Sequence, residues 1–325
     1  MDIDRSPDAL PWAAGQSDRP CTGKRRVRVA CRIVLLWPRA PSIGDAVSDL
    51  ISVIIPARDR PALLREAVES VVAQTYMPVE IIIVLTGATA ATKTDAEGLS
   101  KRFPIHLVET SPLNLAATRN AGLAVAKGDW VSCLDDDDVW LPEKLAKQMQ
   151  MARQQHADLV TTNWVRFGDG MAEELWAPRG KSPLPVGLDY RQALVRNNYV
   201  CTGALVKTEV LRGLGGFDVT MRACEDWDMW RRVALDHRIA YLDEGLMRVR
   251  VHNQNMSSNR WLMRRHIFKH LLKMSFELPA DLRRSLVFAW HYWVIYFVFD
   301  CLNSVTGDRL RSLLANRQRV TDLSR

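Results

Sequence analysis

The chain has 325 residues, of which 47% are hydrophobic, and this is enough to build one large α/β domain or two smaller ones. Its formal net charge is +7, but residues 49–259 carry 24 basic and 27 acidic side chains, so this central part is slightly acidic. A domain that binds nucleic acid concentrates positive charge on its folded body. The distribution therefore predicts no nucleic-acid partner.

The cysteine pattern favours a reducing cytoplasm. None of the six cysteines belongs to a C-x-x-C pair, which disfavours a zinc site and a disulfide framework. No uninterrupted apolar run reaches about 18 residues, so no transmembrane helix is predicted. Residues 1–48 contain basic and apolar stretches without a cleavable signal, and we interpret them as a poorly ordered N-terminal extension.

From residue 49 onward the hydrophobic pattern alternates between strands and helices. Continuous β-branched runs such as residues 50–56 are typical of strands buried on both faces, whereas residues 61–75 place Leu64 and Val68 on one helical face. In folds of this order, ligands bind at the carboxyl ends of the strands. The predicted strands cover residues 50–56, 79–85, 105–110, 129–134, 158–167 and part of 241–252, and the predicted helices cover residues 61–75, 114–128, 142–155 and 225–235.

The domain boundaries follow from changes in composition. Residues 49–259 contain the alternating elements and are predicted to form one α/β domain. Within it, residues 168–200 are rich in glycine, proline and polar residues, which predicts a long loop or lid. Residues 260–325 have a helical pattern and carry 12 basic and 5 acidic side chains, so the excess positive charge lies in this C-terminal region.

Four consecutive aspartates, Asp135 to Asp138, follow the predicted strand at residues 129–134. Alternate side chains of an extended chain share a face, so Asp135 and Asp137 are predicted to point together and Asp136 to point away. Two converging carboxylates suit Mg²⁺ or Mn²⁺, and a cation would offset the repulsion among the four charges. In the alternative interpretation all four belong to a loop, and Asp138 or a neighbour caps the next helix.

A second group of acidic residues begins at Glu225. Glu225 and Asp226 are predicted to lie at the N-terminus of a helix, where the helix dipole favours negative charge without any catalytic role. Trp227 and Trp230 are three residues apart and are interpreted as core residues. His252 ends a predicted strand, and a lone histidine is more often structural than a metal ligand.

Taken together, four segments resemble the successive motifs of family 2 glycosyltransferases with the GT-A fold. They begin with ISVIIPARDRP, NLAATRNAGLA, LGGFDVTMRAC and RVRVHNQNMS, and the second of them runs on through the four aspartates. The motifs occur in the order of the family between Ile51 and Ser257, which is about two thirds of the chain. Each motif is weak alone, but their order makes the resemblance specific.

The resemblance implies an enzyme with a GT-A fold, in which helices flank a Rossmann-like mixed α/β sheet, and a reaction that inverts configuration at the transferred sugar. It implies a nucleotide-sugar donor, a glycan or lipid-linked acceptor, and Mn²⁺ or Mg²⁺ as cofactor. By the same resemblance Asp226 is the catalytic base. The implied metal ligands are Asp135, Asp137 and His252, and the implied donor-binding residues are Pro56, Ala57, Arg58, Arg119, Asn120, Asp135 and Asp136.

The chain departs from the family pattern after the second predicted strand. There the family commonly has an acidic D-D-G-S segment that recognises the nucleotide base, whereas this chain has Leu85, Thr86, Gly87 and Ala88. Two other functions therefore stay open. One is a non-catalytic nucleotide-sugar-binding or scaffold protein of a glycan assembly complex, and the other is a metal-dependent nucleotidyl- or phosphotransferase.

The C-terminal region has two open interpretations. Its aromatic stretch at residues 288–299 lies among basic residues, and tryptophan together with basic side chains favours a membrane interface. This predicts peripheral contact of a cytoplasmic protein with the inner face of the plasma membrane. In the alternative interpretation the aromatic side chains pack against the transferase domain and the basic ones face water.

Overall fold

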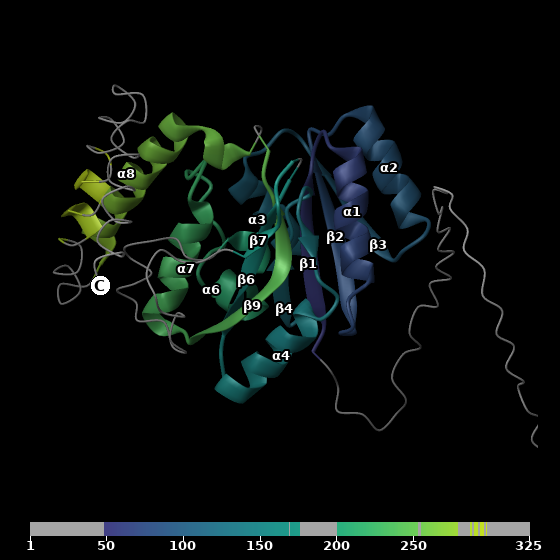
Figure 1. Cartoon of the computed structure of the whole chain (residues 1–325), viewed down its shortest axis with the longest axis horizontal. Coiled ribbons are helices and arrows are strands. Elements are labelled where there is room, and N and C mark those ends of the chain that lie inside the picture. Colours follow the sequence, from purple (N-terminus) through teal and green to yellow (C-terminus); the bar gives the residue numbers. More distant parts are fainter. Residues whose placement is uncertain are drawn as a thin grey trace, which may run out of the picture. The chain divides into compact units, whose positions relative to one another are not determined.

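Figure 1 shows the computed structural model of the chain. The residues that it describes are 49–168, 170–175, 200–252, 255–278, 287, 289–291, 293–295 and 297. The predicted N-terminal extension at residues 1–48 lies outside the described residues, and so does most of the predicted loop at residues 168–200.

A mixed β-sheet runs through the described part of the domain (Figure 1). Its strands are β1 (Ile51–Ala57), β2 (Val79–Thr86), β3 (Ile105–Thr110), β4 (Trp130–Cys133), β5 (Val139–Trp140), β6 (Leu159–Phe167), β7 (Glu174–Leu175), β8 (Leu205–Lys207) and β9 (Ile239–Arg250). The strand order is β3-β2-β1-β4-β8-β6-β9-β5, and β7 pairs with β6. The first four strands of this order are parallel, whereas β8 is antiparallel to both of its neighbours. The predicted mixed sheet is confirmed.

Helices cover both faces of this sheet (Figure 1). On one face lie α1 (Pro61–Val72), α2 (Ala90–Ser100) and α4 (Lys144–Gln155), and on the other α3 (Leu115–Val125), α6 (Thr208–Gly213) and α7 (Glu225–Asp236). Successive residues of β1 alternate between the two cores, with Val53 and Ile55 in the first and Ile54 in the second. A strand buried on both faces needs apolar side chains at every position, which explains its continuous apolar run.

The sequence pattern did not predict α2. This helix contains several threonine and alanine residues, and Ala96 and Leu99 are its buried apolar side chains, too few for a recognisable helical period. Thr89 caps the helix, because its hydroxyl accepts a hydrogen bond from the backbone N–H of Thr92 (3.4 Å). Packing against the sheet, rather than an amphipathic pattern, therefore accounts for this helix. The short elements β5, β7, β8 and α6 were not predicted either.

The C-terminal region begins with α8 (Arg260–Glu277), which lies where a helical region was predicted. Its residues Ile267, Leu271 and Met274 share a hydrophobic core with Trp227 of α7. The indole of Trp227 also stacks on the imidazole of His270, with ring centroids 4.4 Å apart. Among the described helices, none is both long and apolar enough to cross a membrane.

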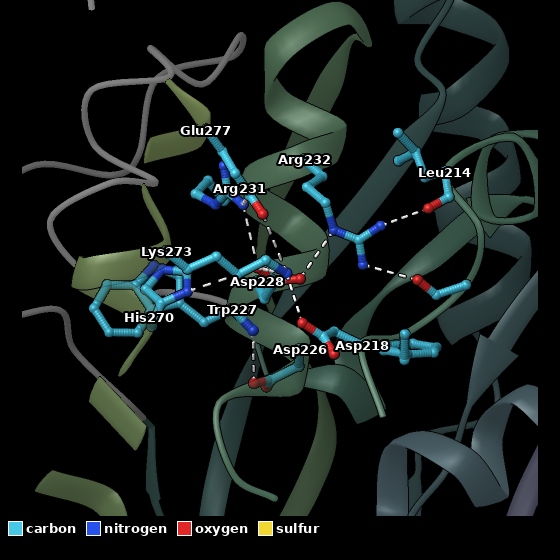
Figure 2. A network of polar contacts seen from close by, with 12 residues as sticks. Leu214, Asp218, Asp226, Trp227, Asp228, Arg231, Arg232, His270, Lys273 and Glu277 are labelled. Atoms are coloured by element: carbon cyan, nitrogen blue, oxygen red, sulfur yellow. Dashed lines mark hydrogen bonds and ion pairs between the residues drawn. The ribbon is translucent and has the colours of Figure 1, made fainter. Parts of the chain in front are cut away.

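A buried network of charges joins α7 to α8 (Figure 2). At its centre Asp228 accepts hydrogen bonds from Arg231 (3.2 Å) and Arg232 (2.9 Å). From α8, Lys273 Nζ lies 3.0 Å from the same carboxylate, and Glu277 accepts a hydrogen bond from Arg231 (2.6 Å). Burial alone would raise the pKa of Asp228, but the three surrounding cations hold it below its usual range. The network therefore fastens α8 to the N-terminal half of α7.

We expect Asp228→Asn to lower the free energy of unfolding by about 3 kcal/mol, because it leaves buried cations without their counter-charge. Denaturant titration followed by circular dichroism measures this quantity. The matched control is Asp236→Asn at the exposed end of the same helix, which should stay within about 0.5 kcal/mol of the wild type. Equal stability of the two variants would contradict the importance of the network.

Candidate active site

A cleft of about 1550 Å³ opens at the carboxyl ends of the parallel strands. Pro56 and Ala57 end β1, Thr86 ends β2, and Asp135 follows β4, and all four residues line the cleft. The N-terminus of α7 and residues of α8 form further parts of its wall. Pockets for a single small molecule typically measure about 300–1000 Å³, so this cleft has room for more than one ligand.

Most of the predicted site residues meet in this cleft, although they come from segments that lie far apart in the sequence. Asn120 and His252 are not among the described residues that line it. Those that line it are Pro56, Ala57, Arg58, Arg119, Asp135, Asp136, Asp137 and Asp226.

The four aspartates form a turn rather than an extension of β4. The turn contains a hydrogen bond from the backbone N–H of Asp138 to the carbonyl oxygen of Asp135 (3.1 Å). Because the chain turns here, Asp136 and Asp137 both bind the guanidinium group of Arg60. The predicted alternation, with Asp136 pointing away from Asp137, is therefore wrong, since it assumed an extended chain.

Asp138 fastens this turn to β9. Its Oδ1 accepts a hydrogen bond from the backbone N–H of Arg250 (3.0 Å), and burial raises its pKa well above the usual range. The alternative prediction that Asp138 or a neighbour caps the next helix is wrong. β5 follows the turn directly, and α4 begins after Glu143, whose side chain makes no capping hydrogen bond. Burial also raises the pKa of Asp136, to about 7, although Arg60 opposes this shift.

Arg119 of α3 joins the aspartate turn to α7. Its side chain is only 2% exposed, and its Nη2 donates a hydrogen bond to Asp135 Oδ1 (2.8 Å) while its Nη1 donates to Glu225 Oε1. The ring of Phe217 lies 5.7 Å from the guanidinium carbon. A single buried cation thus binds carboxylates from two different elements and holds them at a defined separation.

Asp226 is next to Glu225 in the first turn of α7 and is partly buried in the cleft wall. Its Oδ1 accepts a hydrogen bond from the backbone N–H of Trp227 (2.7 Å), as Figure 2 shows. Cys224 precedes the helix with a φ of 60°, a left-handed conformation that is uncommon for a residue with a side chain. Trp227 and Trp230 are each 2% exposed, which confirms that they are core residues.

Asn120 holds the loop that leads into α7. Its Oδ1 accepts a hydrogen bond from the backbone N–H of Phe217 (2.8 Å), and its Nδ2 donates to the carbonyl oxygen of the same residue (2.8 Å). Gly216 has a φ of 76°, and a Cβ atom there would approach Asn120 Oδ1 to 2.6 Å. These contacts position the loop, and the donor-binding role of Asn120 stays a prediction.

Arg60 is a site residue that the sequence did not reveal. It follows β1, and β1 pairs in parallel with β4, so the residues after both strands reach the same edge of the sheet. An arginine after one strand and four aspartates after another would have been a signal of contact if the two strands had been known to be neighbours. Strand pairing is decided by tertiary structure, which is why the signal was missed.

His252 meets the aspartate turn after β9. Its Nε2 lies 2.9 Å from Asp137 Oδ2, and its backbone N–H donates to Asn255 Oδ1 (2.6 Å). Two ligand atoms at this separation can bind one ion whose ligands lie at about 2.1 Å. Among the residues that the structure describes, no three His, Cys, Asp or Glu side chains are grouped to hold a metal ion. Asp137 and His252 are therefore a pair of donors close enough to share one ion, and the metal ligand set stays a prediction.

Thr86 lies where the family resemblance predicted an acid that recognises the nucleotide base. Its Oγ1 accepts a hydrogen bond from the backbone N–H of Leu113 (2.9 Å) and lies 3.4 Å from the carbonyl oxygen of Ser111, to which it donates. Leu85 is 1% exposed and belongs to the core. This wall of the cleft therefore offers a small polar side chain that is already engaged, in place of a carboxylate.

Comparison with known proteins identifies the family. The sequence profile described as "Glycosyl transferase family 2" matches residues 52–215. The chain belongs to this family. Its relative YwdF of Bacillus subtilis (strain 168), an uncharacterized glycosyltransferase, is 32% identical over 194 residues, which cover 58% of this chain and 69% of YwdF.

Solved structures of glycosyltransferases share the fold. The mannosyltransferase PcManGT from Pyrobaculum calidifontis, in complex with GDP-Man and Mn²⁺, matches with a TM-score of 0.57 at 18% identity, over 84% of this chain and 80% of PcManGT. S. aureus TarS 1–349, in complex with UDP-GlcNAc, matches with a TM-score of 0.55 at 15% identity, over 75% of this chain and 80% of TarS 1–349. The predicted GT-A fold and the predicted glycosyltransferase class are confirmed.

We expect Arg119→Lys to lower the free energy of unfolding by about 3 kcal/mol, because one ammonium group cannot replace a planar guanidinium that binds two separated carboxylates. Denaturant titration tests this, and the control is Arg153→Lys. Arg153 forms an exposed pair with Asp49, so its variant should stay within about 0.5 kcal/mol of the wild type. A loss no larger than that of the control would show that Arg119 does not hold the site together.

Proposed function

We propose that this family 2 glycosyltransferase moves a sugar from a nucleotide-sugar donor to a glycan or lipid-linked acceptor by one direct displacement that inverts configuration. The observation that carries the proposal is the double contact of Arg119, which binds Asp135 after β4 and Glu225 beside Asp226. It brings the proposed metal-binding turn and the proposed base to the walls of one cleft. The related solved structures bind UDP-GlcNAc or GDP-Man, which supports a nucleotide-sugar donor without selecting one.

Asp226 is the proposed general base. Both residues line the cleft, but Glu225 is 4% exposed and forms an ion pair with buried Arg119, whereas Asp226 is partly exposed. A carboxylate in this place can accept the proton of an acceptor hydroxyl as that oxygen attacks the anomeric carbon. The hydrogen bond from Trp227 fixes the orientation of the Asp226 carboxylate. Proton transfer and sugar transfer would then occur in one step, with the nucleoside diphosphate as the leaving group.

Asp135, Asp137 and His252 are the proposed ligands of a Mn²⁺ or Mg²⁺ ion. When bound, such an ion would neutralise charge on the leaving diphosphate. Arg60 pairs with both Asp136 and Asp137, so the aspartate turn already attracts positive charge. The complex of PcManGT with Mn²⁺ supports the choice of a divalent ion.

The donor side of the cleft is proposed to include Pro56, Ala57 and Arg58, with Asp136 and Arg119 nearer the aspartate turn. Thr86 lies where the family resemblance predicts an acid, so recognition of the base is proposed to differ from the common pattern. That difference favours the second candidate function, a non-catalytic nucleotide-sugar-binding protein of a glycan assembly complex. Release of nucleoside diphosphate from a panel of nucleotide sugars with Mn²⁺ separates the two, because a binding protein would release none.

The proposed location is the cytoplasm, with peripheral contact with the inner face of the plasma membrane. Among the described residues, Cys133, Cys201 and Cys224 are buried and form no disulfide, which agrees with a reducing compartment. A lipid-linked acceptor would require that the cleft come close to a bilayer.

Asp226→Asn should lower turnover by about 100-fold or more while leaving the fold and the affinity for the donor unchanged, because it removes only the proton acceptor. Turnover is measured as release of nucleoside diphosphate at saturating acceptor, and donor affinity by calorimetry. Asp236→Asn, at the far end of α7, is the matched control and should have wild-type turnover. Undiminished turnover in Asp226→Asn would remove this residue from the catalytic role.

Asp135→Ala and Asp137→Ala should each abolish Mn²⁺-dependent binding of the donor, because too few protein ligands would be left for the ion. Asp136→Ala should have a milder effect. Binding of Mn²⁺ is followed by electron paramagnetic resonance with a nucleoside diphosphate present, and near-ultraviolet circular dichroism checks that each variant is folded. If the first two variants bound Mn²⁺ as the wild type does, the metal assignment would be wrong.

A further inference from the structure

The helix α8 presents apolar side chains on two faces. On the inner face Leu262, Met263 and Ile267 line the cleft. On the outer face Trp261 and Phe276 are 78% and 77% exposed, and Phe268 and Leu272 are exposed between them. At about 100° per residue, the four outer side chains fall within an arc of about 80°, so they form one stripe along the helix.

The helical residues that the structure describes between 287 and 297 continue this surface. Phe268 packs edge to face against Trp290, with ring centroids 5.5 Å apart, so the segment lies beside the stripe. Its residues Val294 and Ile295 are exposed, whereas Trp293 turns inward and stacks on Trp227 with centroids 5.5 Å apart. Trp293 thus packs against the domain, whereas Val294 and Ile295 of the same segment are exposed.

Basic residues accompany the exposed stripe. Arg265 is exposed within the same arc, and the guanidinium of Arg264 lies over the ring of Trp261 at 5.4 Å. Residues 260–325 carry 12 basic and 5 acidic side chains, whereas residues 49–259 carry 24 and 27. The apolar stripe therefore belongs to the most positively charged part of the chain.

The outer face of α8 has a fixed relation to the cleft. Lys273 of α8 contacts buried Asp228 of α7, and His270 stacks on Trp227, as Figure 2 shows in part. These contacts hold the outer face of α8 in a fixed position relative to the N-terminal turn of α7, where Asp226 lies.

We propose that the outer face of α8, made of Trp261, Arg265, Phe268, Leu272 and Phe276, docks on an anionic lipid membrane and holds the cleft beside a lipid-linked acceptor. Large exposed apolar stripes on soluble folds mark interaction surfaces. Tryptophan and basic side chains suit the interface of a bilayer, where each basic residue near an anionic surface adds about 1 kcal/mol to binding. A second copy of this chain is the less suitable occupant, because a two-fold contact would bring two basic faces together. Only the nature of the acceptor rests on the proposed function.

The test is cosedimentation of the full chain with vesicles of phosphatidylcholine, with and without about 30% phosphatidylglycerol. We expect binding to the anionic vesicles and its loss as salt is raised. The double variant Trp261→Ser, Phe276→Ser should bind anionic vesicles at least about tenfold more weakly, since its buried apolar area on the membrane is reduced. The matched control is Val219→Ser, an exposed apolar residue outside α8, which should bind as the wild type does.

Three results would overturn the docking proposal. One is equal sedimentation of the wild type with neutral and anionic vesicles. Another is wild-type vesicle binding by the double variant, or by Phe276→Ser alone if the double variant does not fold. The third is a dimer, seen by analytical ultracentrifugation without lipid, that the variants dissociate, because it would assign the stripe to a second copy instead.

Donor turnover with a water-soluble acceptor distinguishes failure of this proposal from failure of the proposed function. A chain that binds anionic vesicles but turns over no nucleotide sugar would keep the docking surface and lose the catalytic function. A chain that turns over donor without binding vesicles would keep the catalytic function and lose the docking surface.

Discussion

The candidate site depends on one buried cation. Arg119 comes from α3, yet its guanidinium group binds Asp135 after β4 and Glu225 at the start of α7. A guanidinium group removed from water needs opposite charge close by, so the folded domain requires both carboxylates in place. Stability of the fold and geometry of the cleft are thus set by the same contact.

The start of α7 has three acidic residues, Glu225, Asp226 and Asp228, and each has a different environment. All three lie in the first turn, where the helix dipole favours negative charge. Glu225 faces Arg119 and the aspartate turn, Asp228 faces the cations that bind α8, and Asp226 lies between them on the cleft. One turn of helix therefore connects the donor side of the cleft, the proposed base and the helix proposed to meet a membrane.

The sequence predicted elements whose signal is local and missed those whose cause is not. β1 and β2 were predicted because burial on both faces demands an apolar residue at every position. α2 was missed because packing rather than an amphipathic period holds it. Arg60 was missed because its partners follow a strand that becomes its neighbour only in the folded sheet.

The sequence by itself determined the class of fold, the family and eight of the residues that line the cleft, because strand burial and motif order can be recognised along the chain. Tertiary structure alone decided how those residues meet. In the folded chain the aspartates form a turn instead of extending a strand. Asp136 and Asp137 share Arg60 as their cation, and Asp138 accepts a hydrogen bond from β9. The reason is physical: a buried charge takes whichever partner the packing brings within reach, and that partner can lie anywhere in the sequence.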